Sequence, residues 1–563
     1  MFVRVKSTKN SPRKSVQIVE SIRTGNKVFQ KIVRYVGIAL NDEELEQLKL
    51  LAESIKSKLE DNGQILLLNP EELDKIKTKP VTQDIIDDDY NVDIRNLQEE
   101  QRLVRGIHDV YGTLFDNQGY KNILKNPARN KSSVEIFKNI VLARIANPLS
   151  KKASVDMLEE DFGISLNLDR VYQMMDKLDD SAIEKLNEIT YKNTANLFQN
   201  KIDIIFFDCT TIYFEAFEED DLRKNGYSKD LKFNQPQVLL ALMVTKEGLP
   251  VGYRVFEGSK YEGHTLIPLL KEIKDKYNLD KIVFVADSGM MNEDNLLEME
   301  KHGFKYIVGS RLKNLPDNMK SQVLNKENYK EIKDSEQNYK IAEFNHKNRR
   351  LIVNYSEKRA KKDAYDRSKS IEKLKAKLLK KKNPKEYLSN CGNKKYLLLE
   401  GEASLVLNEE KINTESQWDG LLGIITNDNK FSYQELLKQY NNLWQVENAF
   451  RITKHDLKVR PVFHWKPERV KAHFAISFAA YALVKHLEYR VKLQYKKISP
   501  EKIRQLLIRV QTSVLYDSTK NIRYGFPSRV SQDAKKIYNI LKIPCCSTPY
   551  VIKKCSAHEK IES

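Results

Sequence analysis

The sequence predicts a multidomain α+β protein in which an α/β core is interrupted by a β-rich insertion and flanked by a small N-terminal β unit and helical regions. Three observations predict this class. Polar and apolar residues alternate with period two over residues 1–37, helical periodicity dominates residues 98–200 and returns from 432, and apolar strand-like runs alternate with amphipathic segments from 201. A chain of 563 residues is expected to hold several domains.

The charge balance indicates a polyanionic partner. The chain has 96 Lys and Arg against 78 Asp and Glu, a net charge of +18, and a pI of about 9.2. Nucleic acid is the commonest partner of so basic a protein. The alternative is a basic protein whose charge only keeps it in solution.

Cysteine usage and hydropathy bound the compartment. The five cysteines form no CxxC pair, which argues against a structural zinc site, and their odd number without a signal peptide favours the reducing cytoplasm. The uncharged apolar run Ala472–Val484 is too short to cross a bilayer, so we expect a buried core helix there and no membrane partner.

Residues 1–40 are expected to form a basic β unit. The strand-like segments FVRVK, SVQIVESIR and KVFQKIVRYVG carry most of it, with a turn at Thr24-Gly25-Asn26, and residues 1–37 contain nine Lys or Arg and one acid. Such a unit either lies on DNA phosphates or is a sheet whose lysines protect its edges. Residues 41–97 are predicted to be a helix followed by an acidic linker.

Residues 98–200 are predicted to be a helical DNA-binding region. Within it, KKASVDMLEEDFGISLNLDRVYQMMDKL has the pattern of a helix, a turn with glycine and a second helix. This pair is either a DNA-reading helix-turn-helix, with Lys151, Lys152 and Arg170 as contacts, or a purely structural pair.

The catalytic core is predicted over residues 201–309 and 426–490. KIDIIFFDCT is an apolar strand that ends on Asp208, a hairpin turns at Glu247-Gly248, and KIVFVADSG is a buried strand that delivers Asp287. With the helices HTLIPLLKEIKDKY and NEDNLLEMEKHG and the strand FKYIVGS, the order β-β-β-α-β-α-β is that of an RNase H-like core.

The predicted insertion domain spans residues 310–425, and residues 491–563 are predicted to form a C-terminal helical region. The insertion mixes short strands with a basic helix over 356–384, which has twelve Lys or Arg and four acids. That charge run is either a solvated face or a phosphate-binding arm.

A third carboxylate-bearing element follows the insertion. Tyr440, Glu447 and Lys454 are seven residues apart, and on one continuous helix they would share a face. Asp208, Asp287 and Glu447 therefore predict a site for two Mg²⁺ or Mn²⁺ ions, which take hard oxygen ligands. Each carboxylate alone is explained as well by a helix cap or a loop. A phosphatase nucleophile at Asp208 would need a second acid where Thr210 stands.

These residues resemble the DDE transposases of bacterial insertion sequences, over roughly residues 100–490. The chain is similar to the branch whose catalytic helix has the pattern Tyr, two residues, Arg, three residues, Glu, six residues, Lys. Tyr440, Glu447 and Lys454 match this pattern, whereas Leu443 stands in the Arg position, so the phosphate grip of that Arg is absent or moved, with Gln445 or Arg451 as substitutes.

The resemblance implies cut-and-paste transposition on double-stranded DNA, at terminal inverted repeats and target DNA, by a homodimer in a synaptic complex in the bacterial cytoplasm. Such enzymes commonly pass through a hairpin on the transposon end, with an aromatic side chain receiving a flipped base. Besides Tyr440 and Lys454, the residues expected to contact DNA are Arg311, Trp418, Trp444, Arg451, Lys458 and Arg460, with Trp465 and His455 next.

Two other functions remain open from the sequence. A transposase-derived DNA-binding protein without catalysis would bind repeat DNA and never nick it. An RNase H-like nuclease would cut nucleic acid without yielding strand-transfer products. All three carboxylates are present, which favours the active transposase.

Overall fold

The structure is a computed structural model of the 563-residue chain, and its chain separates into two compact units, Met1–Asp89 and Tyr90–Ser563, which are described separately. The described residues of the first unit are 2–7, 14–24, 27–39 and single positions between 42 and 56; those of the second are 91–199, 202–215, 218–226, 235–260, 267, 270, 282–289, 292–333, 338–378, 396–400 and 404–552.

The first unit contains the predicted β strands. β1 (Phe2–Ser7), β2 (Lys14–Thr24) and β3 (Lys27–Ala39) form an antiparallel sheet in the order β1-β2-β3. Val16 and Ile18 of β2 are fully buried and pack with Leu45 and Ala52. The described positions between 42 and 56 are helical, while the predicted turn at 25–26 and most of the acidic linker lie outside the described residues.

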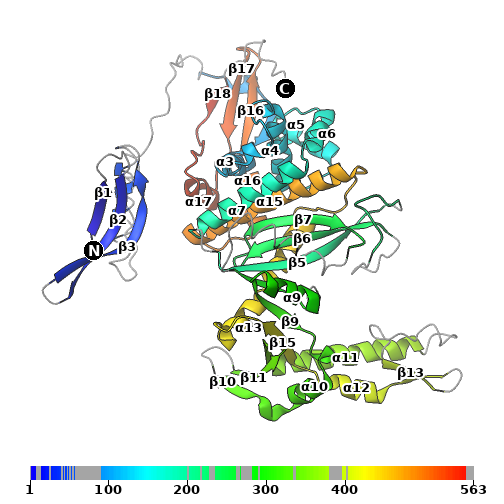
Figure 1. Ribbon diagram of the computed structural model, residues 1–563. Coiled ribbons are helices and arrows are strands. Elements are labelled where there is room, and N and C mark those ends of the chain that lie inside the picture. The colour runs from blue at the N-terminus through cyan, green and yellow to red at the C-terminus, as the bar shows by residue number, and fades with distance from the viewer. Residues whose placement is uncertain are drawn as a thin grey trace. The chain divides into compact units, whose positions relative to one another are not determined.

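A mixed sheet forms the centre of the second unit, in the order β10-β11-β12-β15-β9-β8-β5-β6-β7 (Figure 1). β5, β6 and β7 pair antiparallel, whereas β8 pairs parallel with both β5 and β9. The sheet includes the strands predicted around Asp208 and Asp287, and the hairpin turns at Gly248 with φ +75°. The bounds are β5 (Ile204–Tyr213), β6 (Gln237–Thr245), β7 (Pro250–Glu257), β8 (Val283–Ala286) and β9 (Lys305–Ser310).

The sheet continues into the predicted insertion. β15 pairs antiparallel with β9 and with β12, so these strands extend the central sheet. The described part of the basic stretch forms α11, and β13 and β14 form a separate small sheet. The bounds are β10 (Lys330–Lys333), β11 (Asn338–His346), β12 (Arg349–Tyr355), α11 (Glu357–Leu378), β13 (Leu397–Glu400), β14 (Ser404–Leu407), α12 (Glu409–Ser416) and β15 (Leu421–Thr426).

The two faces of the sheet bury different cores. Ile204 and Phe206 of β5 belong to a large core, here the helix-side core, which the helices before β5 and after β15 share. Ile205 and Phe207 point to the opposite core, which α9 (Glu293–Lys301) and α10 (Asp317–Leu324) cover. This alternation follows from the period of two along a strand.

The helix-side core is built around one long helix. α15 (Pro467–Gln494) contains the predicted buried stretch, and the Tyr481 hydroxyl donates to the Gly248 carbonyl at 2.9 Å. In Figure 1 α15 (orange) lies beside β7 and packs against the helices that precede β5, the last of which also packs directly on β7. Those helices are α3 (Thr113–Asn117), α4 (Lys131–Ala146), α5 (Lys151–Phe162), α6 (Leu168–Asp176) and α7 (Asp180–Leu197).

The predicted helical flanks also contain strands, which is a correction. β4 (Leu97–Val104) pairs with β16 (Gln511–Asp517) from the opposite end of the chain. The expectation of a purely helical region over 491–563 was wrong, because α16 (Pro500–Ile508) and α17 (Gln532–Ile540) accompany β16, β17 (Ile522–Pro527) and β18 (Tyr550–Ile552). Pairing between distant segments is not visible in local periodicity.

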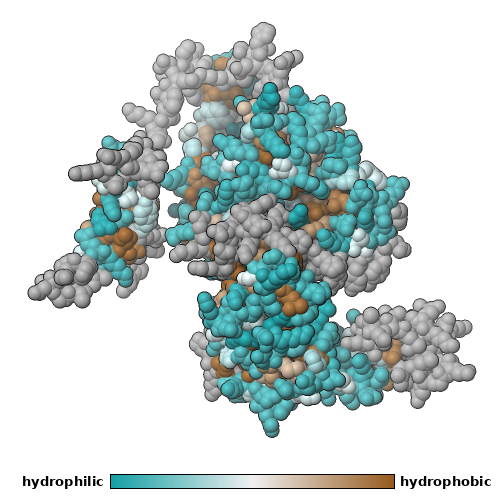
Figure 2. All heavy atoms as spheres, in the orientation of Figure 1, coloured by the Kyte–Doolittle hydropathy of each residue, from teal (hydrophilic) through white to brown (hydrophobic). Residues whose placement is uncertain are grey.

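The surface of the second unit is largely polar. Figure 2 shows a mostly hydrophilic face with apolar side chains in small separate groups. Among the helices in the described ranges, none is both long and apolar enough to span a membrane. Cys209, Cys545 and Cys546 are free thiols, and Cys391 and Cys555 lie outside the described residues.

One ion-pair network fastens α9 to β12 and yields a stability prediction. Arg349 is buried, and its guanidinium donates to Glu300 and Glu293, each at 2.7 Å. Arg349→Met is expected to lower the free energy of unfolding by about 3 kcal/mol, because the carboxylates lose their buried partner. Urea denaturation measures this. Lys347→Gln, which removes an exposed pair with Glu293, is the control and is expected to cost less than about 1 kcal/mol; equal losses would contradict the prediction.

Candidate functional site

Two of the predicted carboxylates lie on neighbouring strands of the central sheet. The last paired positions of β5 and β8 are Phe207 and Ala286, so Asp208 and Asp287 occupy the next position of each parallel strand. Both follow residues of the opposite core and therefore face the helix side. Adjacent strands are about 4.8 Å apart, so the register places the two residues side by side.

The sequence predicted a strand that ends on Asp208, and this was wrong. β5 continues to Tyr213, because β6 supplies pairing partners as far as Gln237. Asp208 is half-buried, and the Cys209 backbone N–H donates to its Oδ1 at 2.8 Å. Asp287 follows β8 directly, as predicted, and its side chain is exposed.

The prediction of one continuous helix over 440–454 was wrong. This part of the chain is divided into α13 (Tyr433–Asn441), α14 (Trp444–Arg451) and a π-helical turn (Ile452–Asp456). Tyr440, Glu447 and Lys454 thus belong to three different segments. Around Asn442 the backbone hydrogen bonds span three residues, as between the Gln445 N–H and the Asn442 carbonyl at 2.9 Å, and in the π turn they span five. These two irregularities interrupt the α-helical period of about 3.6 residues.

The three segments still lie on the side of the sheet that carries the two aspartates. α14 packs on β5 and β6, and its Val446, Ala449 and Phe450 enter the helix-side core. Glu447, on the other side of α14, is exposed. α13 packs on β8 and β9, next to Asp287.

Tyr440 connects this helical region to Asp287. Its hydroxyl donates to Asp287 Oδ1 at 3.5 Å, a long hydrogen bond. Burial and, after it, the negative charges of Asp287 and Glu447 raise the pKa of Tyr440 to about 12. The phenol is therefore neutral at physiological pH, as a donor requires, and both carboxylates are near enough to act on it.

Lys454 connects the end of the helical region to β5. Its ammonium donates to the Thr210 hydroxyl at 2.5 Å. Thr210 is two residues from Asp208 and so lies on the same face of the strand. Lys454 is thereby held beside Thr210, two residues along β5 from Asp208.

Gly309 leaves the space that Tyr440 fills. A Cβ on Gly309 would lie 2.3 Å from the Tyr440 hydroxyl and 3.1 Å from its Cζ. Gly309→Ala is expected to cost about 1–3 kcal/mol of stability through overpacking. In the Tyr440→Phe background the hydroxyl is gone, so the cost is expected to fall. A double-mutant cycle by urea unfolding measures this coupling, and additive effects would show that Tyr440 does not occupy this space.

The carboxylates are not gathered tightly enough here to form a metal-ligand group. Over the described parts of the chain, no three His, Cys, Asp or Glu side chains are placed to hold one ion. The donor set itself fits Mg²⁺ or Mn²⁺, because carboxylate oxygens are the ligands these ions prefer.

A cavity of about 440 Å³ opens beside Asp287. Asp287, Tyr440 and two other predicted residues, Arg311 and Trp418, line it. Arg359 of α11 and Lys313 also line it and were not predicted individually. The basic run over 356–384 was the available signal for Arg359, but its place beside Asp287 depends on how α11 packs.

Leu443 and its suggested substitutes, Gln445 and Arg451, contact other parts of the chain in this structure. Leu443 packs against the helix-side core at the junction of α13 and α14. Arg451 donates to the Asn448 side chain at 3.0 Å, and the Gln445 side-chain oxygen lies near Gly248. Arg359 and Arg311 are the guanidinium groups that share a cavity with Asp287.

The remaining predicted DNA contacts lie on and beyond α14. Trp444 is exposed on α14. Trp465 is exposed, with the Arg223 guanidinium 5.4 Å from its ring, in a cavity of about 380 Å³ that Lys454, His455 and Arg460 also line. Lys458 is exposed and lines a further cavity.

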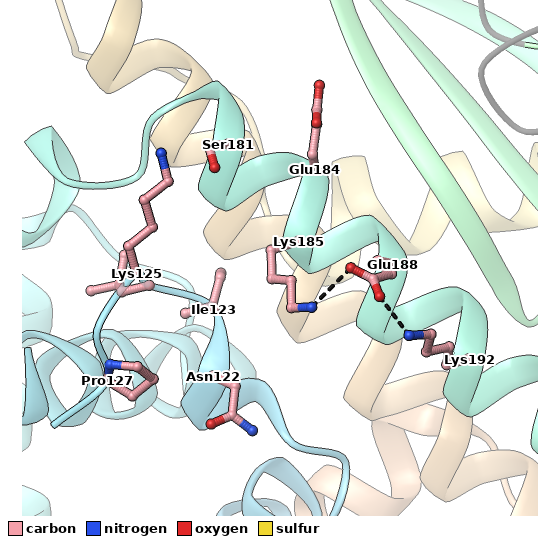
Figure 3. Close-up of a pocket in the computed structure, with 10 residues that line it drawn as sticks. Asn122, Ile123, Lys125, Pro127, Ser181, Glu184, Lys185, Glu188 and Lys192 are labelled. Carbon is pink, nitrogen blue, oxygen red and sulfur yellow. Dashed lines mark hydrogen bonds and ion pairs between the residues drawn. The ribbon is translucent and has the colours of Figure 1, made fainter. Parts of the chain in front are cut away.

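Another cavity, of about 550 Å³, contains none of the predicted residues. It lies between residues 122–127 and α7 (Figure 3). Glu188 forms ion pairs there with Lys185 and Lys192 at 2.9 and 2.5 Å. These charges already compensate one another, so we assign this cavity no part in the site.

Two parts of the chain match known protein families. Residues 199–483 match the Transposase DDE domain family, and residues 3–64 match the N-terminal domain of IS1634 family transposases. No curated protein matches the chain.

Two solved structures show weak likeness. One is a piggyBac transposase synaptic complex with hairpin DNA, with 9% identity, 72% of this chain and 76% of that chain covered, and a TM-score of 0.36. The other is a Mos1 transposase paired-end complex with left transposon end, with 12% identity, 28% and 53% coverage, and a TM-score of 0.14. The family match spans half of the chain, and the chain therefore belongs to the insertion-sequence DDE transposases.

Proposed function

We propose that the protein cleaves DNA at the ends of an insertion sequence in a metal-dependent reaction and transfers the freed 3′ ends to target DNA. The observation that carries this proposal is the register of β5 and β8, which sets Asp208 beside Asp287 on the face where α14 brings Glu447. The parallel pairing of β5, β8 and β9 beside the antiparallel β5-β6-β7 supports an RNase H-like core.

Asp208, Asp287 and Glu447 are the proposed ligands of two Mg²⁺ or Mn²⁺ ions. When bound, the ions would activate the attacking oxygen and stabilise the leaving oxygen of the phosphodiester. The proposal requires the three carboxylates to approach one another more closely than they do here. Their exposure suits this, since Asp287 and Glu447 face solvent.

The surrounding side chains would position the DNA. Arg311 and Arg359 would hold a backbone phosphate beside Asp287, because guanidinium groups bind phosphate with two parallel hydrogen bonds. Tyr440 would keep Asp287 oriented through its hydroxyl, and Lys454 would place a positive charge near Asp208.

The wider assignments are part of the same proposal. Residues 201–309 and 426–490 form the catalytic core, residues 310–425 the insertion, and the basic unit 1–40 and the helical region 98–200 bind DNA. A homodimer would process the two ends of the element together.

A cleavage and joining assay tests the proposal. A labelled duplex carrying the element's own terminal repeat is incubated with Mg²⁺ or Mn²⁺ and a target plasmid, using wild type and Glu447→Gln. Metal-dependent cuts at the repeat boundary and joined products, both absent in the variant, are expected. Cuts without joined products would indicate a nuclease, and binding without cuts would indicate a DNA-binding protein.

A further inference from the structure

A second cationic cavity lies away from the carboxylates. It has a volume of about 510 Å³ and is bounded by α4, the start of α5, the segment 458–464 and α15. Five of its lining residues are Lys or Arg, namely Arg144, Lys151, Lys152, Lys458 and Arg460. No Asp or Glu is among the described residues that line it.

Lys151 is the central feature of this cavity. Lys151 is 6% exposed, and within the described ranges its side chain has neither an ion-pair nor a hydrogen-bond partner. Burial, together with the charge of Arg144, lowers the pKa of Lys151 well below its usual value. Burial without a partner disfavours the charged form of Lys151, and a bound anion would restore it by compensating the charge of the ammonium.

Arg144 lies beside Lys151 and is partly unpaired. Its Nη1 donates to the carbonyls of Leu457 and Lys458 at 2.9 and 3.2 Å, which fixes the segment that closes the cavity. Its Nε is buried and has no partner among the described residues.

The same cations lower the pKa values of two histidines that line the cavity, His464 and His473. Burial and, after it, the charges of Lys151, Arg469 and Arg144 lower the pKa of His464 to about 4. Burial also lowers the pKa of His473, with Arg144 and Lys151 as the next causes. Arg144 and Lys151, both cations, thus act on both rings.

The start of α5 adds backbone donors to these cations. Ser150 caps the helix by accepting from the Ala153 N–H, and Lys151 and Lys152 are its first two residues. The N–H groups of the first helical turn and the positive end of the helix dipole favour an anion there.

We infer that this cavity is a phosphate-binding site in which Lys151, Arg144 and the first turn of α5 hold one phosphate group of the bound DNA. The DNA source rests on the proposed function. It is supported by the neighbouring cavity, which shares Arg460 and His464 and reaches Lys454. The two cavities could thus hold one DNA strand from Lys454 to the start of α5. The buried Lys151 would secure this phosphate rather than read bases from an exposed recognition helix.

Thermal unfolding of the full chain in inorganic phosphate, against chloride at equal ionic strength, tests the site. Phosphate is expected to raise the unfolding midpoint of the wild type by about 2 °C, since it binds only the folded state. Lys151→Met is expected to fold with an unchanged or higher midpoint in chloride and to lose the phosphate response. The exposed Lys536→Met is the control and is expected to keep that response.

A second variant guards against a folding artefact. Lys458 is exposed at the cavity with φ +42°, a conformation that asparagine tolerates, so Lys458→Asn removes one charge without burying anything new. It is expected to weaken the phosphate response partly. Equal responses in wild type, Lys151→Met and Lys458→Asn would overturn the site.

Binding to duplex DNA at several salt concentrations then identifies the source of the phosphate. Lys151→Met is expected to reduce the slope of log affinity against log salt by about one, as for one lost phosphate contact. A phosphate response with an unchanged slope would overturn the DNA assignment in favour of free phosphate. Because the unfolding measurement involves no cleavage, it stands or fails independently of the proposed transposition chemistry.

Discussion

Replacing Asp208 with asparagine is expected to lower the rate of DNA cleavage by at least about 10³-fold, while the affinity for repeat DNA stays within a few-fold of the wild type. The proposed ions would depend on a carboxylate in the middle of β5, and their loss removes several kcal/mol of transition-state stabilisation. Asparagine keeps the oxygen that accepts from the Cys209 N–H at 2.8 Å, so the strand should not be disturbed.

Single-turnover cleavage and electrophoretic binding with the same duplex measure the two quantities. Asp294→Asn, an exposed carboxylate on α9 that lies outside the proposed site, is the matched control. Cleavage by Asp208→Asn at the rate of this control would remove Asp208 from the mechanism, and would leave the pairing of β5 and β8 without its proposed role.

Replacing Arg359 with methionine is expected to lower kcat/KM for cleavage by about 10²-fold. A hydrogen bond to a charged group is worth about 1.5–3 kcal/mol, which corresponds to a factor of about ten to one hundred or slightly more. Arg359 shares the cavity with Asp287 and Tyr440, and its charge acts on the Tyr440 hydroxyl. It is thus placed to supply the phosphate grip that Leu443 lacks.

Arg451→Met is the comparison, because Arg451 lies on α14 itself and donates to Asn448 instead. It is expected to change kcat/KM only a few-fold. If Arg451→Met were the more damaging variant, the phosphate grip would belong to the signature helix and Arg359 would only be a solvated charge on α11.

Local patterns predicted most of the elements that carry the site. β6 is buried along its whole length, β8 is apolar throughout, and β5 begins with the apolar run Ile204–Phe207, so these strands were visible as apolar runs. The position of Asp287 directly after β8 followed from the same run. The spacing of Tyr440, Glu447 and Lys454 identified the family, although they lie on three segments instead of one helix.

Partners from distant parts of the chain decided the rest. β5 extends past Asp208 because β6 pairs with it as far as Tyr213. β4 is a strand because β16 lies beside it. Neither partner is within reach of a sequence window, and strand formation depends on such neighbours more than on intrinsic preference.

The sequence by itself determined the family of this protein and offered the three carboxylates of the proposed chemistry, together with a basic chain. The tertiary structure alone decided which cations lie beside Asp287 and which are buried together. Arg359 lies beside Asp287 because α11 packs there, and Lys151 is buried beside Arg144 because α4 and α5 meet the segment after Lys454. The sequence specifies the charge of each side chain. Burial and the distance between charges determine its energetic effect, and both arise only when distant segments pack together.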